Sequence, residues 1–371
     1  MRKAGVLLVL VLVLAGCGGG GKPPRLIVGA VEDAAKWADP NAKMDLAQRA
    51  GFGAIVLSSV WQPPETLPTA LELTALRGAV EAAVADKIRP IVAVYQLSGN
   101  TPLTDAARSE FASYAASIPK LVPGVKDVIV GNEPNLPLFW KPQFNPDGTD
   151  AAGPAYFKLL AQTYDRIKAV DKGVNVIGGA LAARGGDKPS ASRPTQSPTA
   201  FIEHLGALYK ASGRKKPIMD MFALHPYPEN SSIPPTFAHP HSKTIGLADY
   251  GKLVTLLDSA FPGEHLPVVY GEYGLETTIP PDKAHLYTGT EPPTTHPVDP
   301  TTQGREYAQA IRMVACQPRV RMLLFFHVSD ETALAGLQSG VYYADDSPKA
   351  SLEPVNAAIE DVDAGRVKCG P

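Results

Sequence analysis

The feature that most constrains the fold of this 371-residue chain is a regular alternation of apolar, β-branched runs with longer stretches of helical periodicity. Such runs are typical of strands buried on both faces of a parallel sheet. The pattern occurs eight times, with the runs RLIVGA from Arg25, GAIVLSS from Gly53, RPIVAVY from Arg89, DVIVGN from Asp127, NVIGGA from Asn175, MDMFALH from Met219, PVVYGE from Pro267 and MLLFFHV from Met322. The sequence therefore predicts eight βα units.

Helical stretches follow these runs, at residues 45–50, 73–86, 104–120, 155–170, 200–211, 250–260, 303–314 and 354–364. Alternating strands and helices are the pattern of an α/β protein with a parallel sheet. By length alone, two domains were possible, but no linker interrupts the eight units, and a single α/β barrel commonly uses ~250 residues or more. We therefore predict one (β/α)8 TIM barrel over residues 25–371.

The amino terminus has the features of a secretory signal. Residues 1–3 carry positive charge, and the apolar run 6–14 is too short to span a bilayer stably, so residues 1–16 are expected to be removed. The LAGC sequence that ends at Cys17 resembles the bacterial lipobox, which implies a lipidated cysteine followed by a flexible spacer over residues 17–24. Such a lipid would anchor the domain to the cell membrane in an extracytoplasmic position. An ordinary signal with a chance cysteine is the alternative.

The other two cysteines form an even pair. Cys316 and Cys369 would face an oxidising compartment, and neither has a histidine or another cysteine at metal-ligand spacing. We expect a disulfide between them. Two buried thiols are the alternative, because connectivity cannot be read from spacing.

Composition limits the range of partners. Hydrophobic residues make up 44% of the chain and the formal net charge is −2, so a large core is possible and no basic field for nucleic acid exists. We expect no nucleic-acid partner, no metal and no cofactor, and a monomeric protein.

Two glutamates stand at the ends of predicted strands. Glu133 follows the run DVIVGN and Glu272 ends the run PVVYGE. The carboxyl ends of barrel strands carry the chemistry of α/β barrels, so both carboxylates are expected at that face. Long proline-rich loops also leave the fifth, sixth and seventh strands, at residues 184–198, 228–247 and 277–302. Together they predict a substrate groove over the strand ends.

These residues carry a resemblance to a known superfamily. Asn132-Glu133 after strand four, His225-Pro226-Tyr227 after strand six and Glu272 at strand seven are similar to the motifs of the retaining glycoside hydrolases of the (β/α)8 clan A. The tail from residue 340 also resembles the stretch that follows strand eight in many members. The resemblance spans the chain from about residue 25 in architecture, but only these short motifs in detail.

The resemblance implies roles for the two carboxylates. Glu133 would be the general acid/base and Glu272 the nucleophile that forms a glycosyl intermediate. One carboxyl must then be protonated and the other ionised, and retention of the anomeric configuration requires the two groups to lie ~5–5.5 Å apart. The implied substrate is an oligo- or polysaccharide with β-glycosidic bonds.

Further residues are expected around the substrate. By the resemblance, Asn132 would bond the sugar 2-hydroxyl, Tyr227 would donate to the nucleophile and His225 would line the same subsite. His225 as a core imidazole is the alternative. Trp61 after strand two and Trp140 after strand four are candidates for stacking on sugar faces, with loop packing as the alternative.

The chain also departs from the superfamily pattern. Strand two offers Ser58 and Ser59 where many members carry an arginine that supports the nucleophile. Strand eight supplies Phe326 and His327 in place of a tryptophan platform. Glu276, close after the nucleophile, is expected to be a solvated loop charge.

Three other functions are possible on the sequence. A catalytically inactive barrel that binds glycans at the cell envelope is favoured by the missing arginine and tryptophan. A transporter's solute-binding component would instead need two similar lobes and a hinge. A metal-dependent hydrolase would need ligands from histidines such as His225, His239 and His241, whose spacing fits no usual zinc motif.

Overall fold

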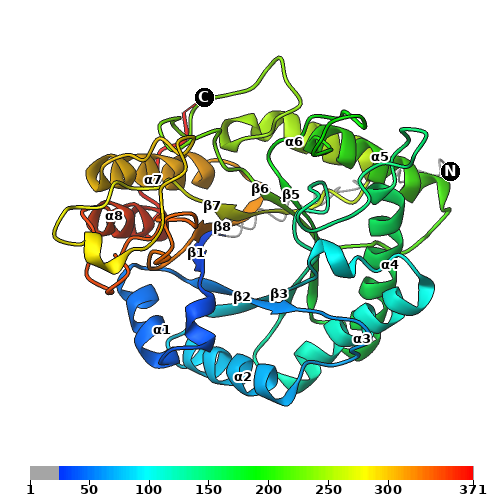
Figure 1. Cartoon of the computed structure of the whole chain (residues 1–371), viewed down its shortest axis with the longest axis horizontal. Coiled ribbons are helices and arrows are strands. Elements are labelled where there is room, and N and C mark those ends of the chain that lie inside the picture. The colour runs from blue at the N-terminus through cyan, green and yellow to red at the C-terminus, as the bar shows by residue number, and fades with distance from the viewer. Residues whose placement is uncertain (1–24, 371) are drawn as a thin grey trace, which may run out of the picture.

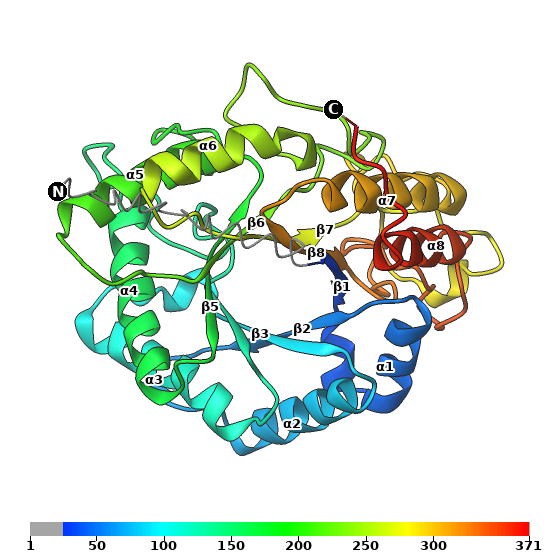
Figure 2. The ribbon, with the colours of Figure 1, turned by 180° about the vertical axis from the view of Figure 1, so that it is seen from behind.

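The computed structural model of this protein describes residues 25–370. The predicted signal peptide, the lipidation site at Cys17 and the spacer lie outside the described residues. The eight strands form one closed, all-parallel barrel in which each strand pairs with the next and β8 pairs with β1. Helices surround the barrel, as the two views along its axis show (Figures 1 and 2). The predicted TIM barrel is confirmed, and the two-lobed alternative is wrong.

The strands lie close to the predicted runs. They are β1 Ile27–Val31, β2 Ala54–Val60, β3 Arg89–Tyr95, β4 Asp127–Val130, β5 Asn175–Ala182, β6 Met221–His225, β7 Val268–Tyr273 and β8 Val320–Phe326. Nearly every strand residue is buried, because helices cover the outer face and side chains fill the inside.

The helices are α1 Pro40–Arg49, α2 Ala70–Ala85, α3 Asp105–Leu121, α4 Ala152–Val170, α5 Pro198–Ala211, α6 Tyr250–Ala260, α7 Pro300–Ala315 and α8 Leu352–Asp363. Three of them begin with proline after a capping residue, where the missing N–H is harmless and the Asp or Ser side chain accepts from free backbone N–H groups. Helix α1 begins five positions earlier than expected, because Asp39 and Pro40 start it.

Two apolar layers hold the barrel together. Small and β-branched side chains such as Val56, Ile91 and Ala223 fill the inside of the barrel. A larger layer, which includes Phe111, Leu160 and Phe222, packs the outer face of the strands against the helices. The barrel is therefore a filled core, and chemistry is confined to its ends.

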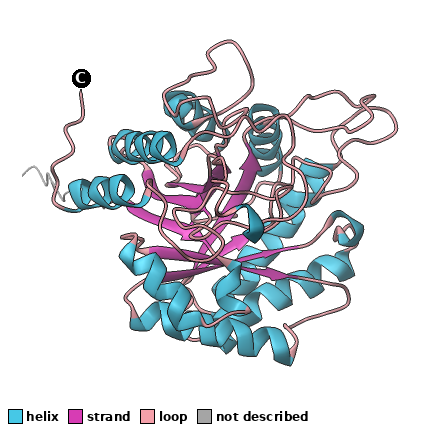
Figure 3. Cartoon of the chain, turned by 60° about the vertical axis from the view of Figure 1, so that its left-hand side comes forward, coloured by secondary structure: helices cyan, strands magenta, loops and turns pink. Residues whose placement is uncertain are grey.

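The connections at the two ends of the barrel differ greatly in length. Long irregular loops follow β5, β6 and β7, and Figure 3 shows loops gathered around one end of the strands. Strand β5 also carries an irregularity between Gly179 and Leu181, where Ala180 adopts a left-handed backbone. This bulge changes the direction of the chain next to the end of β4.

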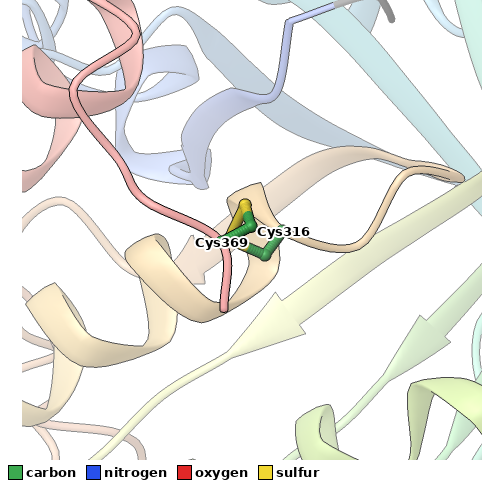
Figure 4. The surroundings of a disulfide bond; sticks show 2 residues. All are labelled: Cys316 and Cys369. Carbon is green, nitrogen blue, oxygen red and sulfur yellow. A yellow bond between two sulfur atoms is a disulfide. The ribbon is translucent and has the colours of Figure 1, made fainter. Parts of the chain in front are cut away.

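A disulfide joins Cys316, at the end of α7, to Cys369 in the C-terminal segment (Figure 4). The bond attaches the segment after α8 to the helix before β8. Within residues 25–370, no helix combines the length and apolar character needed to cross a membrane.

A buried ion pair lies beneath the loops that follow β7 and β8. Asp330 and Lys349 have fully buried side chains, with Nζ 2.7 Å from Oδ1. The ammonium also donates to Thr277 Oγ1 at 2.7 Å and to the Gln338 carbonyl at 3.0 Å, and the Tyr287 hydroxyl donates to Asp330 Oδ2 at 2.8 Å. Each charge is thus both paired and hydrogen-bonded, which a buried ion requires.

Candidate active site

Glu133 is held in an unusual backbone conformation just after β4. Its φ is +38°, in the left-handed region that ordinary residues avoid, and its N–H donates to the carbonyl of Ala180 at 2.8 Å. Ala180 is itself left-handed, with φ +47°. Two adjacent strand ends therefore fix each other, and strain of this kind is typical of functional sites.

Tyr156 of α4 supports this arrangement from beneath. Its hydroxyl donates to the carbonyl of Val130 and accepts from the N–H of Gly179, both at 2.8 Å. Gly131, with φ +83°, lies against the ring, and a Cβ there would come within 3.0 Å of it. The ends of β4 and β5 are therefore connected through one fully buried side chain.

Glu272 projects from β7 into the same region. The hydroxyl of Tyr227, which follows β6, donates to Glu272 Oε2 at 3.1 Å. Burial, together with the charges of Glu272 and Glu133, raises the pKa of Tyr227 well above its ordinary value. The hydroxyl therefore keeps its proton and remains a donor to the carboxylate.

His225, the last residue of β6, contacts both carboxylates. Its Nδ1 lies 3.3 Å from Glu133 Oε1 and 3.6 Å from Glu272 Oε1, and its side chain is 3% exposed. Gly271 makes room for it, because a Cβ there would lie 3.0 Å from the imidazole. The structure thus places the predicted His225 between the two glutamates and buries it there.

The charges of this group act on one another. Burial alone lowers the pKa of His225, but the carboxylates of Glu272 and Glu133 outweigh it, so the pKa is raised. Burial also raises the pKa of Glu272, an effect that His225 and the Tyr227 hydroxyl oppose. Two carboxylates therefore share one imidazole in a poorly solvated place, and their charges favour its protonated form.

The loops after β5, β6 and β7 enclose a cavity of about 520 Å³ next to this group. Its wall includes Glu133, His225, Tyr227, Arg184, Arg193, Glu229, Ser231, Glu276, Thr294 and Thr295. All three proline-rich loops thus contribute side chains to one space, as the sequence predicts. A cavity of this size is typical of small-molecule sites.

Glu276 differs from its prediction as a solvated loop charge. It is 7% exposed, and its N–H donates to Ser231 Oγ at 2.8 Å. Burial and then the neighbouring carboxyl of Glu291 raise the pKa of Glu276 to about 8. The prediction is wrong because another part of the same loop folds back over this residue.

Sequence reasoning also missed Arg184, which follows β5 and lies in the cavity. Its Nη1 donates to the Tyr227 carbonyl at 2.7 Å. Its place immediately after a strand was the available signal, because residues there reach the same face as Glu133 and Glu272.

The two tryptophans are not sugar platforms. Trp61 is fully buried, packs edge-on against Phe111 with ring centroids 5.5 Å apart, and donates from Nε1 to the Glu65 carbonyl at 2.8 Å. Trp140 is also fully buried and packs edge-on against Tyr156, with ring centroids 5.7 Å apart. Neither ring has an exposed face, so the loop-packing alternative holds for both.

Strand β8 places its two candidates differently. Phe326 is partly exposed, and its ring lies edge-on to that of Tyr227, with centroids 6.4 Å apart. His327 is 7% exposed, with Nδ1 3.1 Å from the carbonyl oxygen of Val31 and Nε2 3.4 Å from Glu331 Oε1. Phe326 therefore lies next to Tyr227, which bonds Glu272, whereas the two nitrogens of His327 contact other residues.

The other predicted positions are Asn132, Ser58 and Ser59. Asn132 is partly exposed, and its contact with a sugar hydroxyl stays a prediction. On β2, Ser59 bonds the Tyr114 hydroxyl at 2.9 Å, and the backbone of Ser58 accepts from Lys36 and donates to Asp33. Both serines thus have structural partners.

Of the histidines considered as metal ligands, His239 pairs with Asp249 at 2.7 Å and with Glu229 at 2.9 Å. His241 is exposed. Over residues 25–370, no three or more His, Cys, Asp or Glu side chains are grouped so that they would hold a metal ion.

No protein-family profile matches this chain, and no curated protein sequence does. Solved structures match it well. A family 39 glycoside hydrolase from the gut symbiont Bacteroides cellulosilyticus WH2 gives a TM-score of 0.62 at 17% identity, over 91% of this chain and 64% of that one. A monomeric β-xylosidase from Caulobacter crescentus CB15 gives 0.58 at 17% identity, over 90% and 67%.

A broad-specificity GH5-4 endoglucanase from Clostridium longisporum gives a TM-score of 0.53 at 13% identity, over 88% of both chains. The chain spans less than two thirds of the family 39 enzyme's length. These structural neighbours are glycoside hydrolases, and the likeness shows a shared TIM-barrel fold.

Proposed function

We propose that this protein is an extracytoplasmic, lipid-anchored glycoside hydrolase that cleaves β-glycosidic bonds with retention of configuration. The observation that carries the proposal is the contact of Glu133, just after β4, and Glu272, on β7, with the single imidazole of His225. Glycosidic cleavage needs two carboxyl groups on opposite sides of the scissile bond. The fold of the structural neighbours supports the same class of reaction.

In the proposed mechanism, Glu133 protonates the leaving oxygen while the Glu272 carboxylate attacks the anomeric carbon. Glu133 then removes a proton from the water that releases the sugar. Tyr227 holds the nucleophile's oxygen and Phe326 forms part of the surface beside it. The two oxygens that contact His225 lie 3.3 and 3.6 Å from its Nδ1, which keeps them at most about 6.9 Å apart, a limit that accommodates the ~5–5.5 Å separation of retaining enzymes.

The test uses the full chain in nonionic detergent, with a panel of aryl β-glycosides and polysaccharides. Wild type, Glu133→Ala and Glu272→Ala are compared, and proton NMR identifies the first anomer released. We expect turnover that depends on both glutamates and a β-anomer as first product.

Azide separates the two roles. With an activated aryl β-glycoside, azide should restore turnover of Glu133→Ala through a β-glycosyl azide and of Glu272→Ala through an α-glycosyl azide. An α-anomer from the wild type would overturn the retaining mechanism. No Glu272-dependent turnover over the whole panel would favour the glycan-binding alternative.

A further inference from the structure

The cavity lies on one side of the two glutamates. Its wall includes Glu133, whereas Glu272 is not part of it. In glycosidic cleavage, the general acid lies beside the oxygen of the leaving group. On the proposed function, on which this inference rests, the cavity therefore receives the leaving-group part of the glycan.

Arg184 is a partly buried cation in this cavity. The bond from its Nη1 to the Tyr227 carbonyl fixes the guanidinium group. Burial lowers the pKa of Arg184, and the charges of Glu229 and Glu133 only partly offset this, but arginine stays charged in proteins. Within the described residues Arg184 has no salt-bridge partner, and a poorly solvated cation of this kind is stabilised by an incoming anion.

The positive charge continues away from the catalytic group. Arg193, on the same loop, lines both the cavity and a neighbouring groove of about 840 Å³. The groove wall contains Lys141 and apolar side chains such as Leu138 and Phe144, and no acidic residue among those described. Neither Arg193 nor Lys141 forms a salt bridge with any residue of the described range. The sugar faces and charged groups of a longer glycan would both find partners there.

The acidic residues of the cavity do not cancel these charges. Glu229 is a single carboxylate against the two guanidinium groups of Arg184 and Arg193, and its Oε1 lies 2.9 Å from Nε2 of His239. Glu276 is largely protonated at neutral pH, because its pKa is raised to about 8. Glu133 must itself carry a proton when the substrate is cleaved. With Glu133 and Glu276 protonated, the described wall of the cavity carries two guanidinium groups against the one carboxylate of Glu229, although the whole chain has a formal net charge of −2.

We propose that the substrate is an acidic glycan whose leaving-group side carries a carboxylate or a sulfate ester bound by Arg184, with Arg193 and Lys141 contacting the units beyond. A guanidinium group matches the geometry of both anions through paired N–H donors. The proposal adds the class of substrate to the proposed hydrolase.

The test measures binding separately from hydrolysis. The full chain carrying Glu272→Gln, in nonionic detergent, is titrated by biolayer interferometry against three polymers with the same β-linked backbone. These are hydroxyethyl cellulose, carboxymethyl cellulose and cellulose sulfate. We expect roughly tenfold or tighter binding of one charged polymer over the neutral one, and the preferred polymer distinguishes carboxylate from sulfate.

Matched variants assign this preference to the cavity. Arg184→Gln in the same background should weaken binding of the preferred polymer roughly ten- to a hundredfold, with the neutral polymer changed less than about twofold. Arg305→Gln is the control, because Arg305 lies on α7 beside Glu306 and is mostly exposed. Should Arg184→Gln fold poorly, Arg184→Lys, which keeps the charge but loses the paired donors, takes its place.

Equal binding of the three polymers, or an equal loss in Arg305→Gln, would overturn the inference. Failure of this inference can be distinguished from failure of the proposed function. Glu272-dependent hydrolysis of neutral glycans alone would sustain the hydrolase and reject the acidic substrate. Binding of a charged polymer through Arg184 without hydrolysis of any glycan would reject the hydrolase and sustain recognition of an acidic glycan by the cavity.

Discussion

Two sets of buried charges lie at the carboxyl end of this barrel, and they are balanced in opposite ways. Asp330 and Lys349 form one anion with one cation, both fully buried and fully hydrogen-bonded. Glu133 and Glu272 instead share a single imidazole, and their side chains are 15% and 19% exposed. In the first set, which we call the complete pair, the two charges balance each other. In the second, the incomplete pair, two carboxyl groups have only one imidazole between them.

The difference separates a structural role from the proposed catalytic one. The complete pair joins two parts of the segment after β8, at Asp330 with Gln338 and at Lys349, and bonds them to Thr277 in the loop after β7, so it stabilises these loops. In the incomplete pair, burial and then the nearby charge of Glu133 raise the pKa of Glu272. In the proposed reaction, the positive charge that develops at the anomeric carbon in the transition state would stabilise such a site.

The largest expected effect comes from removing the charge of Glu272, the proposed nucleophile. Glu272→Gln should lower kcat on any hydrolysed glycoside by roughly 10³-fold or more, because an amide cannot form the covalent intermediate. Its melting temperature at pH 7 should equal or exceed that of wild type, since one of two like charges is removed. Calorimetry and aryl-glycoside kinetics measure both, with Glu81→Gln on the exposed side of α2 as control. A large fall in the melting temperature of Glu272→Gln would contradict the view that the charge of Glu272 does not stabilise the fold.

Removing one charge of the Asp330–Lys349 pair is expected to destabilise the fold. Lys349→Met should lower the free energy of unfolding by about 3–5 kcal/mol, because it leaves the buried Asp330 carboxylate unpaired. Urea unfolding measures the loss, with the exposed Lys210→Met as control. The double variant Asp330→Leu with Lys349→Met should recover much of it, since no buried charge remains. A single variant as stable as Lys210→Met would refute the structural role.

A smaller effect is expected from Tyr227→Phe. Loss of its hydrogen bond to the charged Glu272 should lower kcat/KM about 10- to 100-fold. That bond favours the ionised carboxylate, so its removal raises the pKa of Glu272 further, and activity should be lost at higher pH on the acid side of the pH–rate profile. Tyr209→Phe on α5 serves as control. An unmoved acid limb would argue against direct support of the nucleophile.

The smallest effect concerns Glu276. Its folded pKa of about 8 lies above the ordinary 4.5, so the folded chain keeps a proton that the unfolded chain releases between those values. Wild-type stability from this group is therefore complete below about pH 4.5 and is lost as pH rises towards 8. Glu276→Gln lacks this loss, so its melting temperature relative to wild type should increase from pH 5 to pH 8. A constant difference over that range would show that Glu276 does not titrate as proposed.

The barrel and its glutamates could be predicted because both depend on local pattern. Eight buried runs fix the strands, and Glu133 and Glu272 follow from their place at strand ends. The early start of α1 was also readable, since Asp39 and Pro40 are an N-cap and a first-turn proline. That error came from following apolar periodicity alone.

The remaining errors concern side chains whose surroundings come from distant parts of the chain. Nothing near Trp61 in the sequence shows that its ring turns inward onto Phe111. Glu276 is buried by a loop segment that includes Glu291, and Arg184 is oriented by the Tyr227 carbonyl. Such contacts are decided by how long loops pack, which one sequence does not specify.

The contact between Gly271 and His225 has a consequence for recognising working relatives of this protein. A single methyl group at position 271 would press on the imidazole at 3.0 Å while leaving both glutamates in the sequence. A search that scores the two acids alone would count such a chain as an enzyme. Position 271 therefore belongs with the two glutamates among the positions that a comparison of related chains should include.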